Sequence, residues 1–143
     1  MEWIPGDLPY RMSDRTEELQ PDVVVGLLQG SYWAADRSKE TILNSWRDSL
    51  CFGVYGEDGV QVAFMRVVTD GATFAWLCDV IVVPEHRGKG LGKWMMSVLI
   101  GHPRLRGTAI HLGTRDAHGL YEQYGFERRE TMVRRAAAVG RAI

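Results

Sequence analysis

The spacing of hydrophobic residues changes along this chain, and each change predicts a different kind of element. In the first third, apolar residues recur every three or four positions, which is typical of helices packed on one face. This spacing predicts a helix over 21–29 that ends at Gly30, and a second helix capped by Ser38. Residues 10–13 are predicted to form a short first strand.

The middle of the chain carries nearly continuous apolar runs, which favour β-strands. Strands are predicted over 50–55, 60–68 and 72–83, and short glycine-containing turns at 56–59 and 70–71 separate them. Three strands joined by such turns would form an antiparallel meander.

Helical spacing returns after Pro84, which ends the third of these strands. An amphipathic helix is predicted to begin at Leu91, and a short strand over 108–113 follows it. Helices that interrupt a mostly antiparallel sheet define an α+β fold, a mixed α/β sandwich.

The last elements predicted are a second amphipathic helix and a final strand. Thr114 or Asp116 would cap this helix, Gly125 would end it, and Phe126 would open the strand. The tail after Arg134 is rich in alanine and arginine, and either a frayed end or a short helix fits its composition.

Length and composition predict one globular domain over 1–143. Of the 143 residues, 45% are apolar and 24% are charged, and no apolar run reaches the ~20 residues needed to span a bilayer. The first residues lack the pattern of a secretory signal, so we expect a cytoplasmic protein without a membrane partner. Neither the histidines nor the two cysteines have metal-ligand spacing, and Cys51 and Cys78 are expected to be free thiols.

The formal net charge of −1 hides an uneven distribution. Residues 1–85 hold 14 acidic and 6 basic side chains, and residues 86–143 hold 4 acidic and 11 basic ones, so the two parts carry −8 and +7. A near-neutral total argues against a nucleic-acid-binding protein. The split suggests that the second part binds an anion and the first a cation, with chance segregation as the alternative.

The most informative segment joins the third meander strand to the next helix. Residues 84–93 read Pro-Glu-His-Arg-Gly-Lys-Gly-Leu-Gly-Lys. Glycine lets a backbone approach a ligand closely, and a helix N-terminus presents unpaired N–H groups with partial positive charge. The combination predicts a phosphate-binding loop, with Arg87, Lys89 and Lys93 as countercharges.

Two common phosphate loops do not fit this segment. A Walker loop would need glycine and Ser or Thr where Arg87 and Trp94 stand. In the dinucleotide fingerprint the third glycine would come one residue after Gly92. What remains, Arg87-x-x-Gly90-x-Gly92 after a strand ending in Val-x-Pro, resembles the central motif of the GNAT acetyltransferases.

A second stretch strengthens this resemblance. Residues 117–126 read Ala-His-Gly-Leu-Tyr-Glu-Gln-Tyr-Gly-Phe, similar to the C-terminal Ala-x-x-Leu-Tyr-Glu-x-x-Gly-Phe motif of the family. The similarity runs over about 52–126. One departure is Thr114, which stands where many members place an asparagine that contacts the cofactor.

The resemblance implies an N-acetyltransferase that uses acetyl-CoA as donor co-substrate and no metal. The acetyl group would pass to a primary amine of a small molecule or peptide by direct attack in a ternary complex. The pantetheine arm would pair with the strand backbone and the pyrophosphate would bind the glycine loop. The cofactor-binding residues would be Val80, Val82, Arg87, Gly88, Lys89, Gly90, Leu91, Gly92 and Lys93.

Two catalytic residues are expected, the first from the resemblance and the second from its place in the sequence. Tyr121 matches the general acid that protonates the leaving thiolate, with plain core packing as the alternative. Asp79 is a lone carboxylate in an apolar strand and is the candidate proton acceptor for the amine, with an Arg-paired or capping Asp as the alternative. A backbone N–H near Val80 would hold the oxyanion, and His118 is a reserve base.

The acceptor stays open at this stage: polyamine, aminoglycoside, amino acid, peptide N-terminus or lysine. The acidic first part predicts a carboxylate-lined pocket that prefers polycations. Tyr32, Trp33 and Trp46 are interpreted as core residues, with the lining of an acceptor pocket as the alternative. Dimers are frequent in the family, which leaves a homodimer open. The alternatives are a non-catalytic acyl-CoA-binding module and a nucleotide-gripping partner protein unrelated to CoA.

Overall fold

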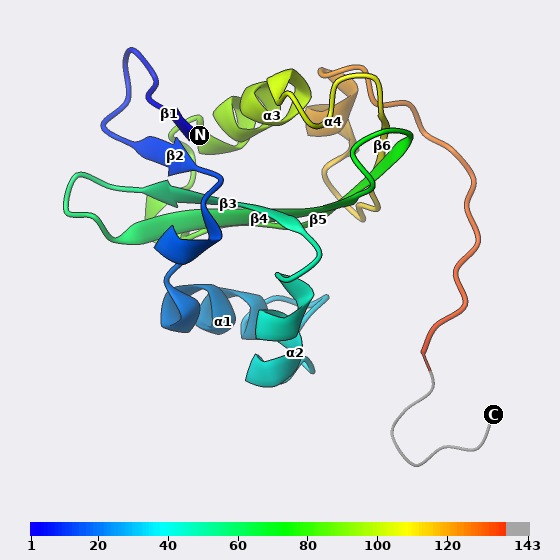
Figure 1. Ribbon diagram of the computed structural model, residues 1–143, viewed down its shortest axis with the longest axis horizontal. Coiled ribbons are helices and arrows are strands. Elements are labelled where there is room, and N and C mark those ends of the chain that lie inside the picture. Colours follow the sequence, from blue (N-terminus) through cyan, green and yellow to red (C-terminus); the bar gives the residue numbers. More distant parts are fainter. Residues whose placement is uncertain (137–143) are drawn as a thin grey trace.

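The computed structural model describes residues 1–136, and its centre is a six-stranded sheet. The strands lie side by side in chain order, so each pairs with the next along the sequence (Figure 1). Neighbours from β1 to β5 are antiparallel, and β5 and β6 are parallel. The strands are β1 (Glu2–Trp3), β2 (Arg11–Ser13), β3 (Leu50–Tyr55), β4 (Gln61–Thr69), β5 (Phe74–Val82) and β6 (Ala109–His111).

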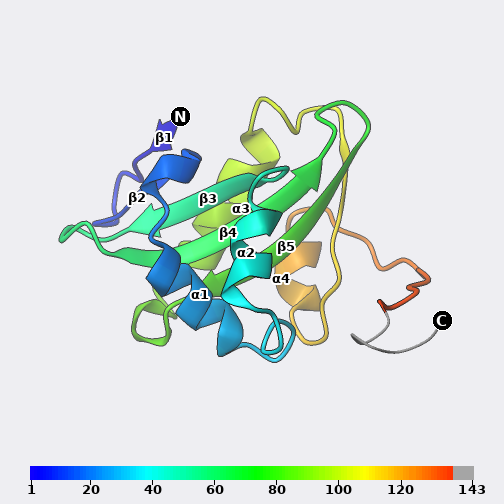
Figure 2. The ribbon, with the colours of Figure 1, turned by 60° about the horizontal axis from the view of Figure 1, so that its bottom comes forward.

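Helices cover both faces of this sheet. One pair, α1 (Pro21–Gln29) and α2 (Lys39–Ser45), lies on one face, and α3 (Leu91–Gly101) and α4 (His118–Glu122) lie on the other (Figures 1 and 2). Two short 3₁₀ turns, η1 (Thr16–Glu18) and η2 (Pro84–His86), link the elements. The arrangement confirms the α+β sandwich.

Each helical layer has its own apolar core. Met95 and Leu99 of α3 are buried with Phe52 of β3 on one face. Val24 and Leu28 of α1 are buried in a second cluster on the other face. Removal of apolar surface from water stabilises both layers against the sheet, by about 25 cal/mol of free energy per Å² buried.

Several elements with clear local sequence patterns lie where the sequence predicted them. The helix over 21–29 and the strand over 50–55 are found with the predicted bounds. The Ser38 side chain accepts a hydrogen bond from the amide of Thr41 at 3.1 Å, which confirms it as the cap of α2. Both cysteines are free thiols, as predicted, and Cys51 is buried.

The predicted strand after Phe126 is wrong, because residues 126–136 form none. The Phe126 amide donates to the carbonyl of Tyr121 at 3.3 Å, and its ring packs edge-on against the Tyr121 ring at 5.8 Å. These contacts close the end of α4 and leave the edge of β6 without this partner. Beyond Arg134 only residues 135 and 136 are described, so the rest of the tail lies outside the described residues.

Two irregularities of β5 prepare the site. Its pairing with β6 covers only Phe74–Trp76, and the strand then continues to Val82 without β6 beside it. Its pairing with β4 shifts register between Phe64 and Arg66, and Asp79 takes a left-handed conformation there with φ of 55°. The backbone of β5 is therefore both bulged and open on one side. Within residues 1–136, no helix has the length and apolar character needed to cross a bilayer.

Candidate active site

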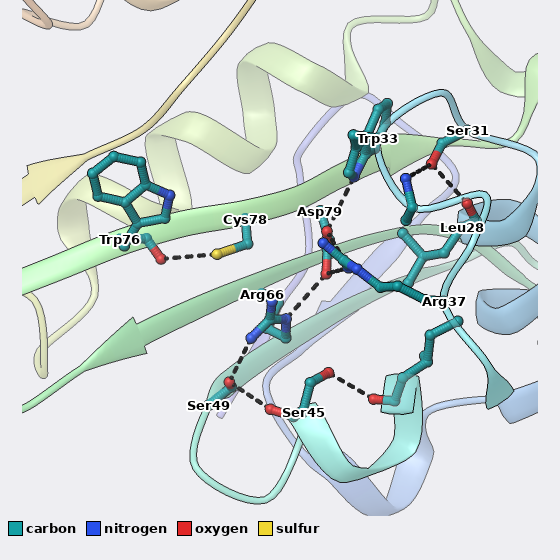
Figure 3. Close-up of polar contacts among 12 residues, drawn as sticks. Leu28, Ser31, Trp33, Arg37, Ser45, Ser49, Arg66, Trp76, Cys78 and Asp79 are labelled. Carbon is teal, nitrogen blue, oxygen red and sulfur yellow. Dashed lines mark hydrogen bonds and ion pairs between the residues drawn. The ribbon is translucent and has the colours of Figure 1, made fainter. Parts of the chain in front are cut away.

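Asp79 is the centre of a buried polar cluster at the bulge of β5. Its Oδ1 accepts hydrogen bonds from Trp33 Nε1 at 3.1 Å and from Arg37 Nη1 at 2.9 Å (Figure 3). Its Oδ2 accepts from Arg37 Nη1 at 2.9 Å and from Arg66 Nε at 3.0 Å. A left-handed conformation is unfavourable for a residue other than glycine, and these charge-assisted bonds offset that strain.

These contacts differ from the lone carboxylate expected of a proton acceptor. The Asp79 side chain is only 2% exposed, and both of its oxygens already accept hydrogen bonds from guanidinium groups. A proton on either oxygen would weaken bonds to Arg37 or Arg66. The contacts therefore favour the paired-carboxylate alternative over the role of a base.

The cluster fixes the loop between α1 and α2 against the sheet. Trp33 and Arg37 both come from this loop and both bond to Asp79. The ring of Tyr32 packs edge-on against Trp33 at 5.1 Å. Tyr32 is 57% exposed and Trp33 40%, so the core interpretation is wrong for these two and the alternative of a pocket lining remains, whereas Trp46 is buried as predicted.

The segment between β6 and α4 contacts the loop between α1 and α2. The guanidinium of Arg115, in the segment between β6 and α4, lies 3.9 Å above the centre of the Tyr32 ring. Since Tyr32 neighbours the loop residues that bond Asp79, the contact brings the β6–α4 segment close to the bulge of β5.

Tyr121 lies on α4 with an available hydroxyl. Its ring packs partly on the main core, and no protein group within residues 1–136 forms a hydrogen bond with its hydroxyl. Burial raises the pKa of this phenol, and the negative charge of Asp116 and the neighbouring Tyr32 raise it further. The group therefore keeps its proton at neutral pH, as a general acid must.

The glycine loop has the conformation expected of an anion site. Gly88 and Gly90 have φ of 76° and 83°, and open space surrounds each of them. The first helical bond of α3 runs from the amide of Trp94 to the carbonyl of Gly90. The amides of residues 91–93 have no such partner among residues 1–136 and stand at the positive end of the helix dipole.

The charged side chains of this loop have different positions. Lys89 and Lys93 are exposed and can approach an anion. Arg87 instead donates from Nε to the carbonyl of Val82 at 3.1 Å. The Tyr10 hydroxyl and His86 Nδ1 are 2.7 Å apart, which ties the start of the loop to the sheet.

Comparison with known proteins shows which family of phosphate-binding proteins the glycine loop belongs to. The sequence profile of a family described as "Acetyltransferase (GNAT) domain" matches residues 48–128. The chain belongs to the GNAT acetyltransferase family. The matched region includes the bulge of β5, the glycine loop and α4.

Individual GNAT relatives agree with this assignment. A Gibberella zeae protein with a provisional name as an acetyltransferase is 34% identical over 127 residues, which cover 73% of this chain and 71% of that protein. A GNAT structure from Xanthomonas campestris, also named provisionally as an acetyltransferase, is 40% identical with a TM-score of 0.85 and covers 89% of this chain and 93% of its own.

A more distant solved structure shows the shared fold alone. A GNAT acetyltransferase from Elizabethkingia anophelis with acetyl-CoA bound has a TM-score of 0.65 at 16% identity, over 85% of this chain and 78% of that one.

A cavity within the described residues lies beside α4, not at the glycine loop. This cavity of about 740 Å³ is lined by residues of β6, α4 and the segment after α4, and its lining includes Trp76, His111, His118 and Tyr121. None of residues 84–93 lines it. In this GNAT chain the hollow therefore lies on the Tyr121 side of the site.

Several carboxylates of the first 85 residues are engaged away from the bulge. Asp14 pairs with the N-terminal amine at 2.7 Å and with His102 Nε2 at 2.8 Å. Glu18 pairs with Arg11, and Asp70 accepts amide hydrogen bonds within the β4–β5 turn. The carboxylate-lined pocket predicted from the charge of −8 gains no support from these contacts.

Sequence reasoning missed the arginines of this GNAT site. Arg66 lies in an apolar strand as Asp79 does, and two opposite charges on paired strands were a usable signal. Arg37 and Arg115 come from loops, where no periodicity exists to place a side chain. Only the folded chain brings them to Asp79 and Tyr32.

Proposed function

We propose that this GNAT protein transfers the acetyl group of acetyl-CoA to a primary amine. One observation carries the proposal. The β5 backbone that loses its β6 partner after Trp76 is followed, beyond η2, by the left-handed glycines and by the unpaired amides at the start of α3. Unpaired backbone groups followed by an anion site suit acetyl-CoA, an acetyl donor that has a long polar arm and a pyrophosphate.

Residues of the loop would hold the donor. The amides from Gly88 to Lys93 would bind the pyrophosphate, with Lys89 and Lys93 as countercharges. Backbone groups of Val80 would pair with the pantetheine arm. The Val82 carbonyl already accepts one hydrogen bond from Arg87 Nε, so it would pair with the arm through its second lone pair.

The chemistry then needs two proton transfers. The amine nitrogen attacks the thioester carbonyl carbon, a C–N bond forms, and the C–S bond breaks. Tyr121 gives its proton to the departing thiolate and regains one from solvent. The nitrogen releases its proton to water or to His118, and the amide of Val80 donates to the developing oxyanion.

Asp79 serves this reaction by position rather than as the base. Its bonds to Arg66 hold the bulge, and its bonds to Trp33 and Arg37 hold the loop that faces the site. A fixed bulge gives the Val80 amide a fixed direction. A hydrogen-bond donor preorganised in this way lowers the activation free energy of acyl transfer by several kcal/mol.

Two measurements, made one after the other, test the proposed function. A thermal shift with acetyl-CoA and none with ATP would support the donor site, since a ligand that binds the folded state raises its stability. CoA release on addition of an amine library would then establish transfer. Binding without release for any amine would favour the non-catalytic acyl-CoA-binding module, and a shift with ATP alone would favour the nucleotide-gripping protein.

A further inference from the structure

The acceptor side of the site carries a guanidinium arranged to bind an anion. The Cζ of Arg115 lies 3.9 Å above the centre of the Tyr32 ring, and the structure gives this side chain no ion pair and no hydrogen bond within residues 1–136. Stacking uses the flat face of a guanidinium, and its N–H donors point outward in the plane. Such a fork matches the two oxygens of a carboxylate or phosphate.

The ring beneath Arg115 is itself held in place. Tyr32 packs against Trp33, and Trp33 Nε1 is bonded to the buried Asp79. Arg37 of the same loop is bonded to Asp79 as well. A guanidinium stacked on an anchored ring loses less freedom on binding than one on a mobile side chain, which favours affinity.

A second charge lies close to the first. Asp116 follows Arg115 directly in the chain, and its negative charge acts on the hydroxyl of Tyr121. Asp116 can attract an ammonium group, and Arg115, the preceding residue, can attract an anion. This pair of opposite charges suits an acceptor that carries both.

We propose that the acceptor is an amine that also bears an anionic group, either a carboxylate or a phosphate, and that Arg115 binds this group. The inference rests on the proposed acetyl transfer. It replaces the polycation preference predicted from the charge of the first 85 residues. The acceptor amine would lie toward Asp116 and Tyr121, and its anion would lie over the Tyr32 ring.

Matched acceptor pairs test the proposal. Glucosamine 6-phosphate against glucosamine removes a phosphate, and an amino acid against its carboxamide removes a carboxylate. We expect the anionic member of at least one pair to have the higher kcat/KM, and the pair that shows the preference identifies the anion. Spermidine and a neutral aminosugar should be poorer acceptors than that anionic amine.

Substitution at Arg115 separates recognition from chemistry. Arg115→Gln should raise KM for the anionic acceptor by roughly ten- to hundredfold, which corresponds to one charge-assisted contact. Its KM for the matched neutral acceptor and its thermal shift with acetyl-CoA should stay at wild-type values. Arg115→Lys should recover part of the loss, and Tyr32→Phe, which keeps the ring, should cost little, whereas Tyr32→Leu should raise KM for the anionic member alone.

The matched control is Arg106→Gln, which removes an exposed arginine elsewhere on the surface. A neutral or polycationic preference in the wild-type protein, or an equal effect of Arg115→Gln on both members of a pair, would overturn the inference and leave the acetyl transfer standing. Acetyl-CoA binding without turnover of any amine would count against the transfer itself and against this acceptor with it.

Discussion

Arg66 Nε lies 3.0 Å from Oδ2 of Asp79, across the step where the β4–β5 register shifts. The pair thus joins the two strands where their regular ladder is interrupted. Because Asp79 also binds Arg37, one buried carboxylate links a bulge of the sheet to the loop between α1 and α2. The bulge and that loop are therefore expected to move, or to stay fixed, together.

Replacing Asp79 should reduce both stability and activity. Asp79→Asn keeps the shape but leaves two guanidiniums without their countercharge, and the free energy of unfolding should fall by about 1–3 kcal/mol. Urea denaturation measures this loss. We expect kcat to fall with it, because the Val80 amide is no longer held in one direction.

A second variant distinguishes a positioning role from that of a base. Arg37→Gln removes a partner of Asp79 and keeps the carboxylate, so it should lower kcat in the same direction while the pH profile keeps its wild-type shape. If Asp79→Asn instead abolished the acid limb of the kcat/KM profile and Arg37→Gln left kcat unchanged, Asp79 would be the base after all.

The parts of this fold that sequence predicted are those with local causes. The cap at Ser38 and the left-handed glycines of the loop depend on a few neighbouring residues, and their patterns were readable. The direction taken by Phe126 was not, because a strand and a ring packed on Tyr121 have the same apolar signature. The loop partners of Asp79, Trp33 and Arg37, could not be predicted either, because no periodicity places a side chain in a loop.

The acid is tested by removing one oxygen. Tyr121→Phe keeps the ring and its packing on Phe126, so acetyl-CoA affinity should barely change. The kcat should fall roughly tenfold to a thousandfold, since general acid catalysis typically contributes 10²–10⁴. Steady-state rates with a good acceptor measure this, and an unchanged kcat would return Tyr121 to a purely structural role.

The pH dependence of the acid follows from the raised pKa of Tyr121. A phenol acts as an acid only while protonated, so its contribution is present below its pKa and is lost as the pH rises through that value. Burial and Asp116 move this pKa above the usual ~10. The kcat should therefore show no loss from this group up to about pH 10, and Tyr121→Phe should remove any loss seen above it. A wild-type decline near neutral pH that Tyr121→Phe abolished would contradict this assignment.

The protein's own thiols should contribute little signal to an assay that detects the free thiol of released CoA. Burial raises the pKa of Cys51 to about 12, and burial also raises the pKa of Cys78. A thiol reacts as its thiolate, so both should react slowly with an aromatic disulfide reagent near pH 8 and quickly after unfolding in urea. Two rapidly reacting thiols in the folded protein would show that the strands open readily.

The glycine loop offers a matched pair of substitutions. Gly90 has φ of 83° with nothing within 4 Å of an added Cβ, so Gly90→Ala meets no atom and its cost of about 1–2 kcal/mol comes from the left-handed backbone alone. Gly92 lies inside α3, where an added Cβ would stand 4.0 Å from Leu120 Cδ2, and Gly92→Ala should be neutral or stabilise the helix by up to about 1 kcal/mol. Thermal denaturation without ligand tests this contrast. With acetyl-CoA present, Gly90→Glu should lose the stabilising shift, because a carboxylate would stand at the proposed pyrophosphate site. A wild-type shift for Gly90→Glu would place the donor's phosphates elsewhere.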